Sequence, residues 1–182
     1  MGIWIAVAIV LFVLGSMMAL KPSGIDIRLD TLRMTARKLG LNPKLIACPD
    51  WIAGKDGEFG RGMIGQYGLV LDDVKLPLSR YQVIDGQWRP VVSSNLDSFD
   101  QSAKFLLDKV PLELPSSIAP HVKALATQAN SIVLYWEDIA YVRPVSNPNY
   151  DKAAIEPDLL HLKSQLALWA KQLQKPISHP NE

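Results

Sequence analysis

The chain has 182 residues, of which 48% are hydrophobic and 20% charged, with one cysteine and a formal net charge of +1. This length suits one ordinary domain, and the composition excludes both a disordered chain and a disulfide scaffold. A net charge near zero argues against a dedicated nucleic-acid binder, which normally carries a basic surplus. We therefore expect no nucleic-acid partner.

The first twenty residues differ from all the others. They include 17 hydrophobic residues and no Asp, Glu, Lys or Arg, and from Ile3 to Leu20 only Gly15 and Ser16 interrupt the apolar run. Eighteen helical residues at about 1.5 Å each span roughly 27 Å, close to the hydrocarbon thickness of a bilayer. The pattern predicts a transmembrane anchor over residues 1–20. Its expected membrane contacts are Ile3, Trp4, Leu11, Phe12 and Leu20.

A cleaved signal peptide is the alternative interpretation of this segment. Such a peptide needs a positively charged start and small residues before the cleavage site. Here nothing charged precedes the apolar run except the amino terminus, and Met17-Met18-Ala19 fits an A-x-A site poorly. The residues therefore favour an anchor that is retained.

Charge bias predicts the topology of this anchor. No Lys or Arg comes before the apolar run, and several follow it within about twenty residues. The positive-inside rule then places the N-terminus outside and residues 21–182 in the cytoplasm. The single Cys48 is compatible with that reducing compartment. The basic residues behind the topology signal, which can also contact anionic lipid, are Lys21, Arg28, Arg33, Arg37 and Lys38, with Lys44 beyond them.

A juxtamembrane amphipathic helix is expected within residues 21–42. Ser23 followed by Asp26 resembles a capping box, and Gly40 before Pro43 indicates the end of the helix. Between them the apolar residues recur at a spacing of four and three, as on one face of a helix. The residues of this stripe are Ile25, Leu29, Leu32, Ala36 and Leu39.

The next part of the sequence predicts a loop and a β-hairpin. Residues 54–62 hold four glycines among charged residues, which is typical of a mobile loop. Strands are expected over 66–71 and 79–84. The pair Asp85-Gly86 lies between two β-rich runs and is the strongest hairpin signal of the chain.

The C-terminal half predicts several more elements. An apolar stripe over 159–173, with Leu159 and Leu173 at its ends, indicates a final helix over about 157–174. Before it we expect a short helix over 98–109 and strands over 131–136 and 139–143. A second short helix is expected to begin at Ser117, and the apolar residues on one side of it are Ile118, Val122, Leu125 and Ala129.

The order of helices and strands predicts an α+β protein: an N-terminal transmembrane helix followed by one small domain with a mainly antiparallel sheet and several helices. The expected divisions are a transmembrane anchor (1–20), a juxtamembrane amphipathic helix (21–42), an α+β soluble domain (43–175) and a flexible tail (176–182).

The sequence shows no motif for nucleophilic, phosphate-binding or metal chemistry. It has no G-x-S-x-G, no G-x-x-x-x-G-K-[ST] and no C-x-x-C, and Cys48 lies in an apolar run typical of a buried thiol. The three histidines His121, His161 and His179 are scattered. Acidic pairs after strands, Asp72-Asp73 and Glu137-Asp138, are interpreted as solvated turns. We expect no catalytic, cofactor-binding or metal-binding residues and no cofactor.

Two apolar helix stripes are candidate partner surfaces. The stripes over 25–39 and 159–173 are shorter than a free coiled coil requires, so they can pack on the domain's own sheet or lend a face to a partner helix. The candidate partner-binding residues on them are Leu29, Leu32, Leu162, Leu166 and Trp169.

Several segments together resemble a poorly characterised group of proteins. They are the anchor, Leu-Arg-Met-Thr-Ala-Arg-Lys-Leu-Gly-Leu at 32–41, the hairpin through Trp88 and Val-Leu-Tyr-Trp at 133–136. The group consists of small single-pass inner-membrane proteins of Gram-negative bacteria, some loosely labelled accessory subunits of preprotein translocase, and includes an essential membrane-anchored cell-division protein. The resemblance implies an inner-membrane location and a role in division. It implies no site that can be transferred residue by residue.

The sequence thus predicts a non-enzymatic, membrane-anchored adaptor that binds other inner-membrane envelope proteins, with cell division implied by the resemblance alone. One alternative is an accessory factor for protein translocation or envelope biogenesis. Another is a membrane-bound enzyme whose site is assembled from distant residues, such as Asp72, Glu137 and His121. The sequence does not predict an oligomeric state.

Overall fold

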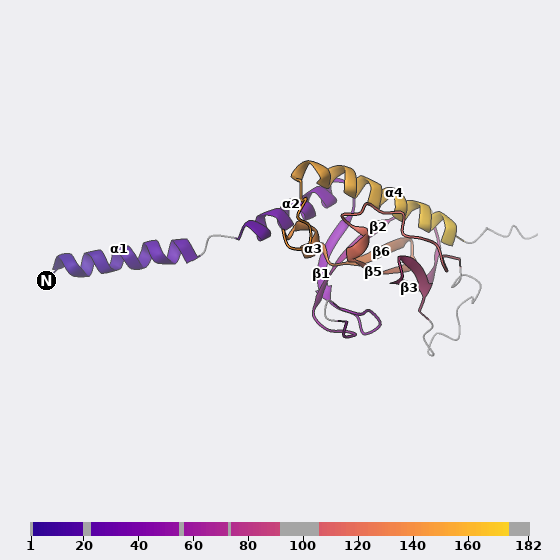
Figure 1. Cartoon of the computed structure of the whole chain (residues 1–182), viewed down its shortest axis with the longest axis horizontal. Helices are drawn as coiled ribbons and strands as arrows, with labels where there is room; N and C mark the ends of the chain where they lie inside the picture. Colours follow the sequence, from indigo (N-terminus) through magenta and orange to yellow (C-terminus); the bar gives the residue numbers. More distant parts are fainter. Residues whose placement is uncertain (1, 20–22, 55–56, 73, 92–105, 175–182) are drawn as a thin grey trace, which may run out of the picture.

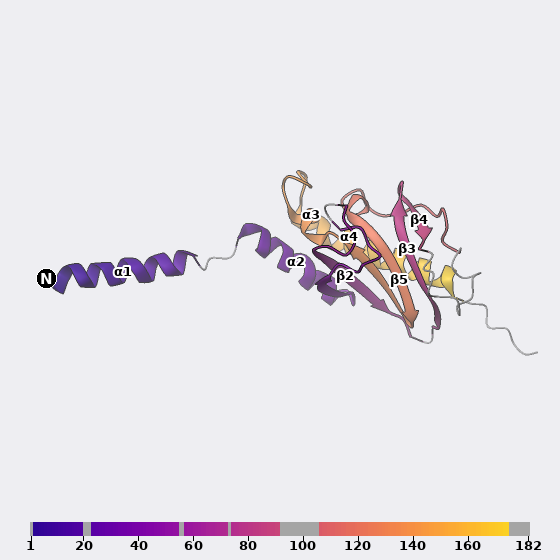
Figure 2. The ribbon, with the colours of Figure 1, turned by 90° about the horizontal axis from the view of Figure 1, so that it is seen from below.

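The computed structural model of the chain describes residues 2–19, 23–54, 57–72, 74–91 and 106–174 (Figure 1). Helix α1 (Gly2–Ala19) stands apart from the rest, and all other elements form one folded domain. The view from below shows the same separation (Figure 2).

The centre of the domain is a six-stranded sheet in the order β1-β2-β6-β5-β3-β4, in which every neighbouring pair is antiparallel. The hairpin formed by β5 and β6 lies between β2 and β3. Leu71, which follows β2, contacts the turn of this hairpin: its N–H donates to the Asn130 carbonyl at 2.8 Å. The strands are β1 (Asn42–Ala47), β2 (Met63–Val70), β3 (Leu76–Ile84), β4 (Gln87–Pro90), β5 (Val122–Ala129) and β6 (Ser131–Trp136).

Two helices, α2 (Gly24–Lys38) and α4 (Ile155–Leu173), cover one face of this sheet (Figures 1 and 2). The main hydrophobic core lies between them and the sheet, because alternate residues of the strands point to this face. Its aromatic members include Tyr67 from β2, Trp88 from β4 and Trp169 from α4. The described part of the domain also includes two 3-10 turns, Ala119–His121 and Lys152–Ala154, and the five-residue helix α3 (Asp138–Val142).

The opposite face of the sheet is covered in part by the segment between β1 and β2. Ile52 from this segment is fully buried against Ile64 and Ala124 in a second, smaller cluster. Trp51 packs edge-to-face on Tyr135 at 5.6 Å, and the Arg80 guanidinium lies 5.3 Å from the Trp51 ring centre. The described part of the predicted 54–62 loop lies outside the named helices and strands.

Several local predictions are confirmed. The Ser23 side chain accepts from the Asp26 N–H and the Asp26 side chain accepts from the Ser23 N–H, so the capping box of α2 is present. Asp85 and Gly86 connect β3 to β4 with φ of 52° and 72°, the left-handed values that a tight hairpin turn requires. Strand β6 spans the predicted residues 131–136, and α4 matches the predicted final helix.

The predicted helix over 118–129 is wrong, because residues 122–129 form β5. This strand lies between β3 and β6 and hydrogen-bonds to both of them. Its residues Ala124 and Ala126 favour a helix locally, but a central strand satisfies its backbone groups from both sides. Tertiary pairing therefore overrides the helical spacing of the apolar residues.

The predicted strand over 139–143 is also wrong, because residues 138–142 form α3. Its Tyr141 hydroxyl donates to Asp158 of α4 at 2.9 Å, and Ala140 and Val142 are buried. Burial of consecutive residues on several sides is incompatible with the alternation of a half-buried strand. The predicted helix over 98–109 falls mostly outside the described residues, and its described end, 106–109, is a turn.

The fold-class prediction is wrong in its membrane-spanning anchor. Among the described residues, the structure holds no helix that is both long enough and apolar enough to cross a membrane.

Candidate functional site

Helix α1 presents an apolar surface that the folded domain does not cover. All its described side chains, residues 2–15, are exposed, and they are apolar around the whole circumference of the helix. A helix with this composition is normally buried in protein or in lipid. Of the predicted anchor residues, Ile3, Trp4, Leu11 and Phe12 lie on this surface with 63% or more of their area exposed. Leu20 lies outside the described residues.

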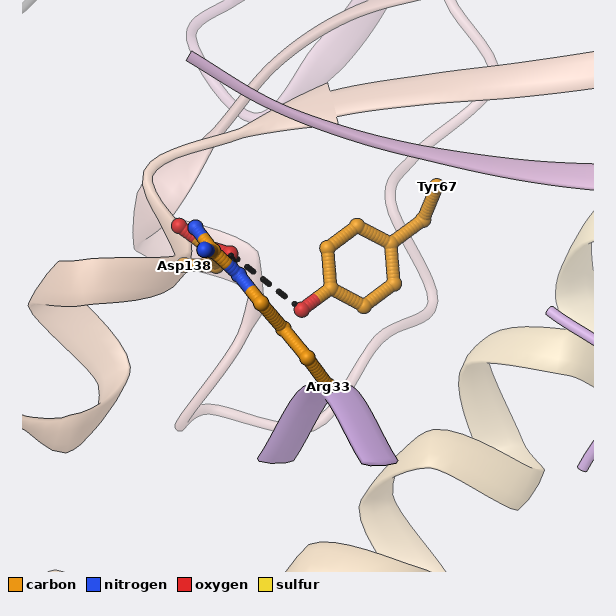
Figure 3. A network of polar contacts seen from close by, with 3 residues as sticks. All are labelled: Arg33, Tyr67 and Asp138. Carbon is orange, nitrogen blue, oxygen red and sulfur yellow. Dashed lines mark hydrogen bonds and ion pairs between the residues drawn. The ribbon is translucent and has the colours of Figure 1, made fainter. Parts of the chain in front are cut away.

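A network of three polar side chains holds α2 on the domain (Figure 3). Arg33 of α2 donates through Nε to Oδ2 of Asp138 at 2.8 Å, and the Tyr67 hydroxyl donates to the same oxygen at 3.3 Å. The side chain of Asp138 is 3% exposed and that of Arg33 is 20% exposed. The network therefore joins α2, β2 and the first residue of α3 through a nearly buried ion pair.

The charges of this network are mutually stabilised. Burial alone would lower the pKa of Arg33, but the hydrogen bond and the negative charge of Asp138 outweigh it, and the pKa is raised. Burial, reinforced by the Asp138 charge, raises the pKa of Tyr67 well above its ordinary value. The arrangement thus keeps a cation, an anion and a neutral phenol in fixed positions. It is suited to holding elements together.

The backbone of β2 makes room for this carboxylate. A Cβ on Gly65 would lie 2.8 Å from Cγ of Asp138 and 3.0 Å from the Trp136 carbonyl oxygen. Such contacts are closer than side chains tolerate, so this position in β2 requires glycine. Asp138 is itself 2% exposed, and its interpretation as part of a solvated turn is wrong. Sequence reasoning missed the network because no local pattern joins residues 33, 67 and 138.

The predicted lipid-contacting residues have different environments. The guanidinium of Arg28 lies 4.8 Å from the ring centre of Tyr150, and the guanidinium of Arg33 forms the ion pair with Asp138. Arg37 and Lys38 are exposed at the end of α2, where Arg37 donates to the Met34 sulfur at 3.4 Å. Lys44 is exposed on β1, and Lys21 lies outside the described residues.

The five candidate partner-binding residues lie in the domain's own core. Leu32, Leu162 and Leu166 have no exposed area, Trp169 is 2% exposed, and Leu29 packs against the same cluster. Leu32, Leu162, Leu166 and Trp169 are therefore inaccessible to a partner in this structure, whereas Leu29 is partly exposed at the margin of the core. The exposed apolar side chains on the same two helices are Ile27, Met34, Leu160 and Leu168.

Of the three residues named for a dispersed enzyme site, His121 and Glu137 are neighbours and Asp72 lies far from them. Asp72 follows β2 at the end where Val70 pairs with Ser131, whereas Glu137 follows β6 at the opposite end, where Gly65 pairs with Trp136. The five residue steps from Gly65 to Val70, at about 3.3 Å each, separate the two ends of this strand pair by more than 15 Å. His121 does lie beside Glu137, whose N–H donates to the His121 carbonyl at 2.9 Å.

The His121 surroundings are themselves paired. Glu137 forms an ion pair with Lys123 at 3.2 Å, and burial lowers the pKa of His121 against the opposing charge of Glu137. Cys48 is buried, its thiol contacts the Ile52 carbonyl at 3.4 Å, and burial raises its pKa. Within the described ranges, no three His, Cys, Asp or Glu side chains are grouped as metal ligands would be.

A scan against protein-family models, a search of curated proteins and a search of solved structures each find no match for this chain. The resemblance to small inner-membrane proteins therefore rests on the residues quoted for it alone.

Proposed function

We propose that the chain is a non-enzymatic adaptor that associates with a membrane through α1 and binds other inner-membrane proteins through its folded domain. The observation that carries this proposal is the exposure of α1, whose described side chains present a continuous apolar surface. Exposed apolar surface of this size is unstable in water and marks an interaction site. Acyl chains match it because they are apolar on every side.

The attachment of α2 supports the adaptor part of the proposal. The Arg33–Asp138 pair ties α2 to the sheet, and α2 begins at Gly24, five residues after α1 ends at Ala19. The domain therefore stays within a short distance of whatever binds α1. Confinement to one surface raises the effective concentration of a domain toward other proteins held there.

A flotation experiment with a matched pair of variants tests the membrane association. Ile9 of α1 and Ile27 of α2 are exposed to 59% and 56%, so Ile9→Asp and Ile27→Asp alter equally accessible positions. The full chain and Ile27→Asp are expected to float with phosphatidylglycerol-containing vesicles. Ile9→Asp is expected to remain in the dense fraction because a carboxylate is costly among acyl chains. Failure of the wild-type chain to float would overturn the association.

Cell division is the process proposed from the resemblance. Depletion of the protein is then expected to give filamentous cells, and a fluorescent fusion should collect at mid-cell. Normal division with uniform fluorescence would contradict this role. If exported precursors accumulate before any change in cell shape, an accessory role in translocation or envelope biogenesis replaces it.

A further inference from the structure

The two edge strands of the sheet, β4 and β1, differ in their hydrogen-bonding partners. At the β4 edge, residues 109–112 pair with the strand: the Trp88 N–H donates to the Val110 carbonyl at 3.0 Å, and the Lys109 N–H donates to the Trp88 carbonyl at 2.9 Å. At the other end of the order, β1 pairs with β2 alone. In the described structure, β1 is thus the edge to which no further strand is added.

The register shows which backbone groups of β1 point away from the sheet. The Cys48 N–H donates to the Gly62 carbonyl at 2.9 Å, so residue 48 faces β2. Since an antiparallel strand alternates, the even-numbered residues of β1 also face β2, and Pro43, Leu45 and Ala47 point outward. The outward row offers the N–H groups and carbonyls of Leu45 and Ala47, whereas Pro43 has no N–H and is buried. This spacing suits an added strand.

The side chains beside this edge are apolar on one face. Leu45 pairs with Gly65 and Ala47 pairs with Met63, so Leu45, Ala47 and Met63 share a face of the sheet. Leu45 is 51% exposed and Met63 is 61% exposed. An added strand would place alternate apolar side chains against them.

The charged side chains at the end of α2 and on β1 are all positive. Residues 37–47 contain Arg37, Lys38 and Lys44, each exposed, and no Asp or Glu. Lys163 of α4 adds a further ammonium beside them, where it donates to the Leu39 carbonyl at 2.7 Å. The side chain of Lys44 points to the face opposite that of Leu45. Acidic residues alternating with apolar ones would therefore meet Lys44 on one face and Leu45 on the other.

We propose that β1 binds an extended segment of a partner protein by strand addition, and that apolar and acidic residues alternate in this segment. Main-chain hydrogen bonds would supply the affinity, and the alternating side chains the specificity, as in other cases of β-augmentation. The inference rests on the proposed adaptor function and states the chemistry of the partner that the domain recognises.

Peptide binding to the full chain in detergent micelles tests the proposal. The probe is a fluorescent, acetylated peptide, Glu-Ile-Glu-Val-Glu-Val, followed by fluorescence anisotropy. Leu45→Pro removes an outward N–H without breaking a bond to β2 and should weaken binding by about tenfold or more, whereas Leu45→Ala keeps the N–H and should weaken it only a few-fold. Lys44→Glu should also weaken binding. Equal affinities for Leu45→Pro and the wild type, or no binding by the wild type, would overturn the proposal.

A second measurement remains decisive if Leu45→Pro does not fold. Amide hydrogen exchange at Leu45 and Ala47 of the wild type should slow when the peptide is added, and a peptide N-methylated at alternate residues should not cause this slowing. Unchanged exchange would contradict strand addition. Wild-type dimers that Leu45→Ala or Lys44→Glu dissociates would instead identify a second copy as the occupant.

The result of the peptide-binding experiment is independent of the result of the flotation experiment that tests membrane association. The peptide assay needs no vesicles, and vesicle flotation does not involve β1. Leu45→Ala is therefore expected to float like the wild type. A chain that floats but does not bind the peptide would overturn only the strand-addition proposal.

Discussion

Helices α1 and α4 have nearly the same length, 18 and 19 residues, but opposite relations to the domain. In α4 the buried residues recur every three or four positions, from Ile155 to Leu173, and the charged residues lie on the other side. In α1 every described side chain is apolar or glycine, and all are exposed. A helix with a single apolar stripe can pack this stripe against a sheet while its polar face stays in contact with water. An apolar circumference leaves α1 no side that is suited to water.

The largest expected change in stability distinguishes a buried tryptophan of α4 from an exposed tryptophan of α1. Trp169 of α4 is 2% exposed and packs edge-to-face on Trp88 at 5.1 Å, whereas Trp4 of α1 is 79% exposed. Trp169→Ala should lower the free energy of unfolding by about 3–5 kcal/mol because it leaves a cavity. Trp4→Ala should change it by less than about 0.5 kcal/mol. Denaturant titration of the full chain, followed by circular dichroism, measures both; equal losses would contradict the comparison.

The next prediction concerns the network that joins α2 to the sheet. Asp138→Ala should cost about 3 kcal/mol, because it leaves the partly buried guanidinium of Arg33 without its counter-charge. The control is Glu58→Ala, which breaks an exposed ion pair with Arg61 and should cost less than about 1 kcal/mol. Replacing both Arg33 and Asp138 by Leu should recover part of the loss. If Asp138→Ala and Glu58→Ala cost the same, the network does not hold α2 in place.

The pH dependence of the folded domain should reflect its buried phenols. Burial raises the pKa of Tyr81 to about 12, and the other four tyrosines are also raised, chiefly by burial. A folded pKa above the unfolded value means that the stabilisation is complete below about pH 10 and declines as the pH rises toward 12. Absorbance at 295 nm should show delayed phenolate formation in the folded chain. Midpoints near 10 both with and without denaturant would contradict the burial of these rings.

The smallest effect is expected at the start of α2, between the two regions. Ser23→Ala removes the hydroxyl that accepts from the Asp26 N–H and should cost about 1 kcal/mol. Thr31→Ala, farther along the same helix, is a suitable comparison because its hydroxyl only donates to the Ile27 carbonyl within the helix. Thermal unfolding should show a larger decrease in Tm for Ser23→Ala than for Thr31→Ala. The reverse order would indicate that the cap contributes little.

Local signals in the sequence predicted the elements whose determinants are local. The Ser23 and Asp26 cap, the Asp85-Gly86 turn and the stripe of α4 each involve residues a few positions apart. The prediction failed where distant segments decide the structure. The helical spacing of Val122 and Leu125 yields to pairing with β3 and β6, and Asp138 is buried because Arg33 and Tyr67 reach it.

The candidate interaction surfaces likewise depend partly on local sequence and partly on contacts between distant segments. The sequence alone determined that the N-terminal segment is apolar on all sides and that two further helices carry one apolar stripe each, because hydropathy and helical spacing are properties of the chain. Only the tertiary structure decided that Leu162, Leu166 and Trp169 are covered and that, within the described ranges, β1 pairs with a strand on one side only. Burial and strand order depend on which segments meet, and that is settled by contacts between residues far apart in sequence.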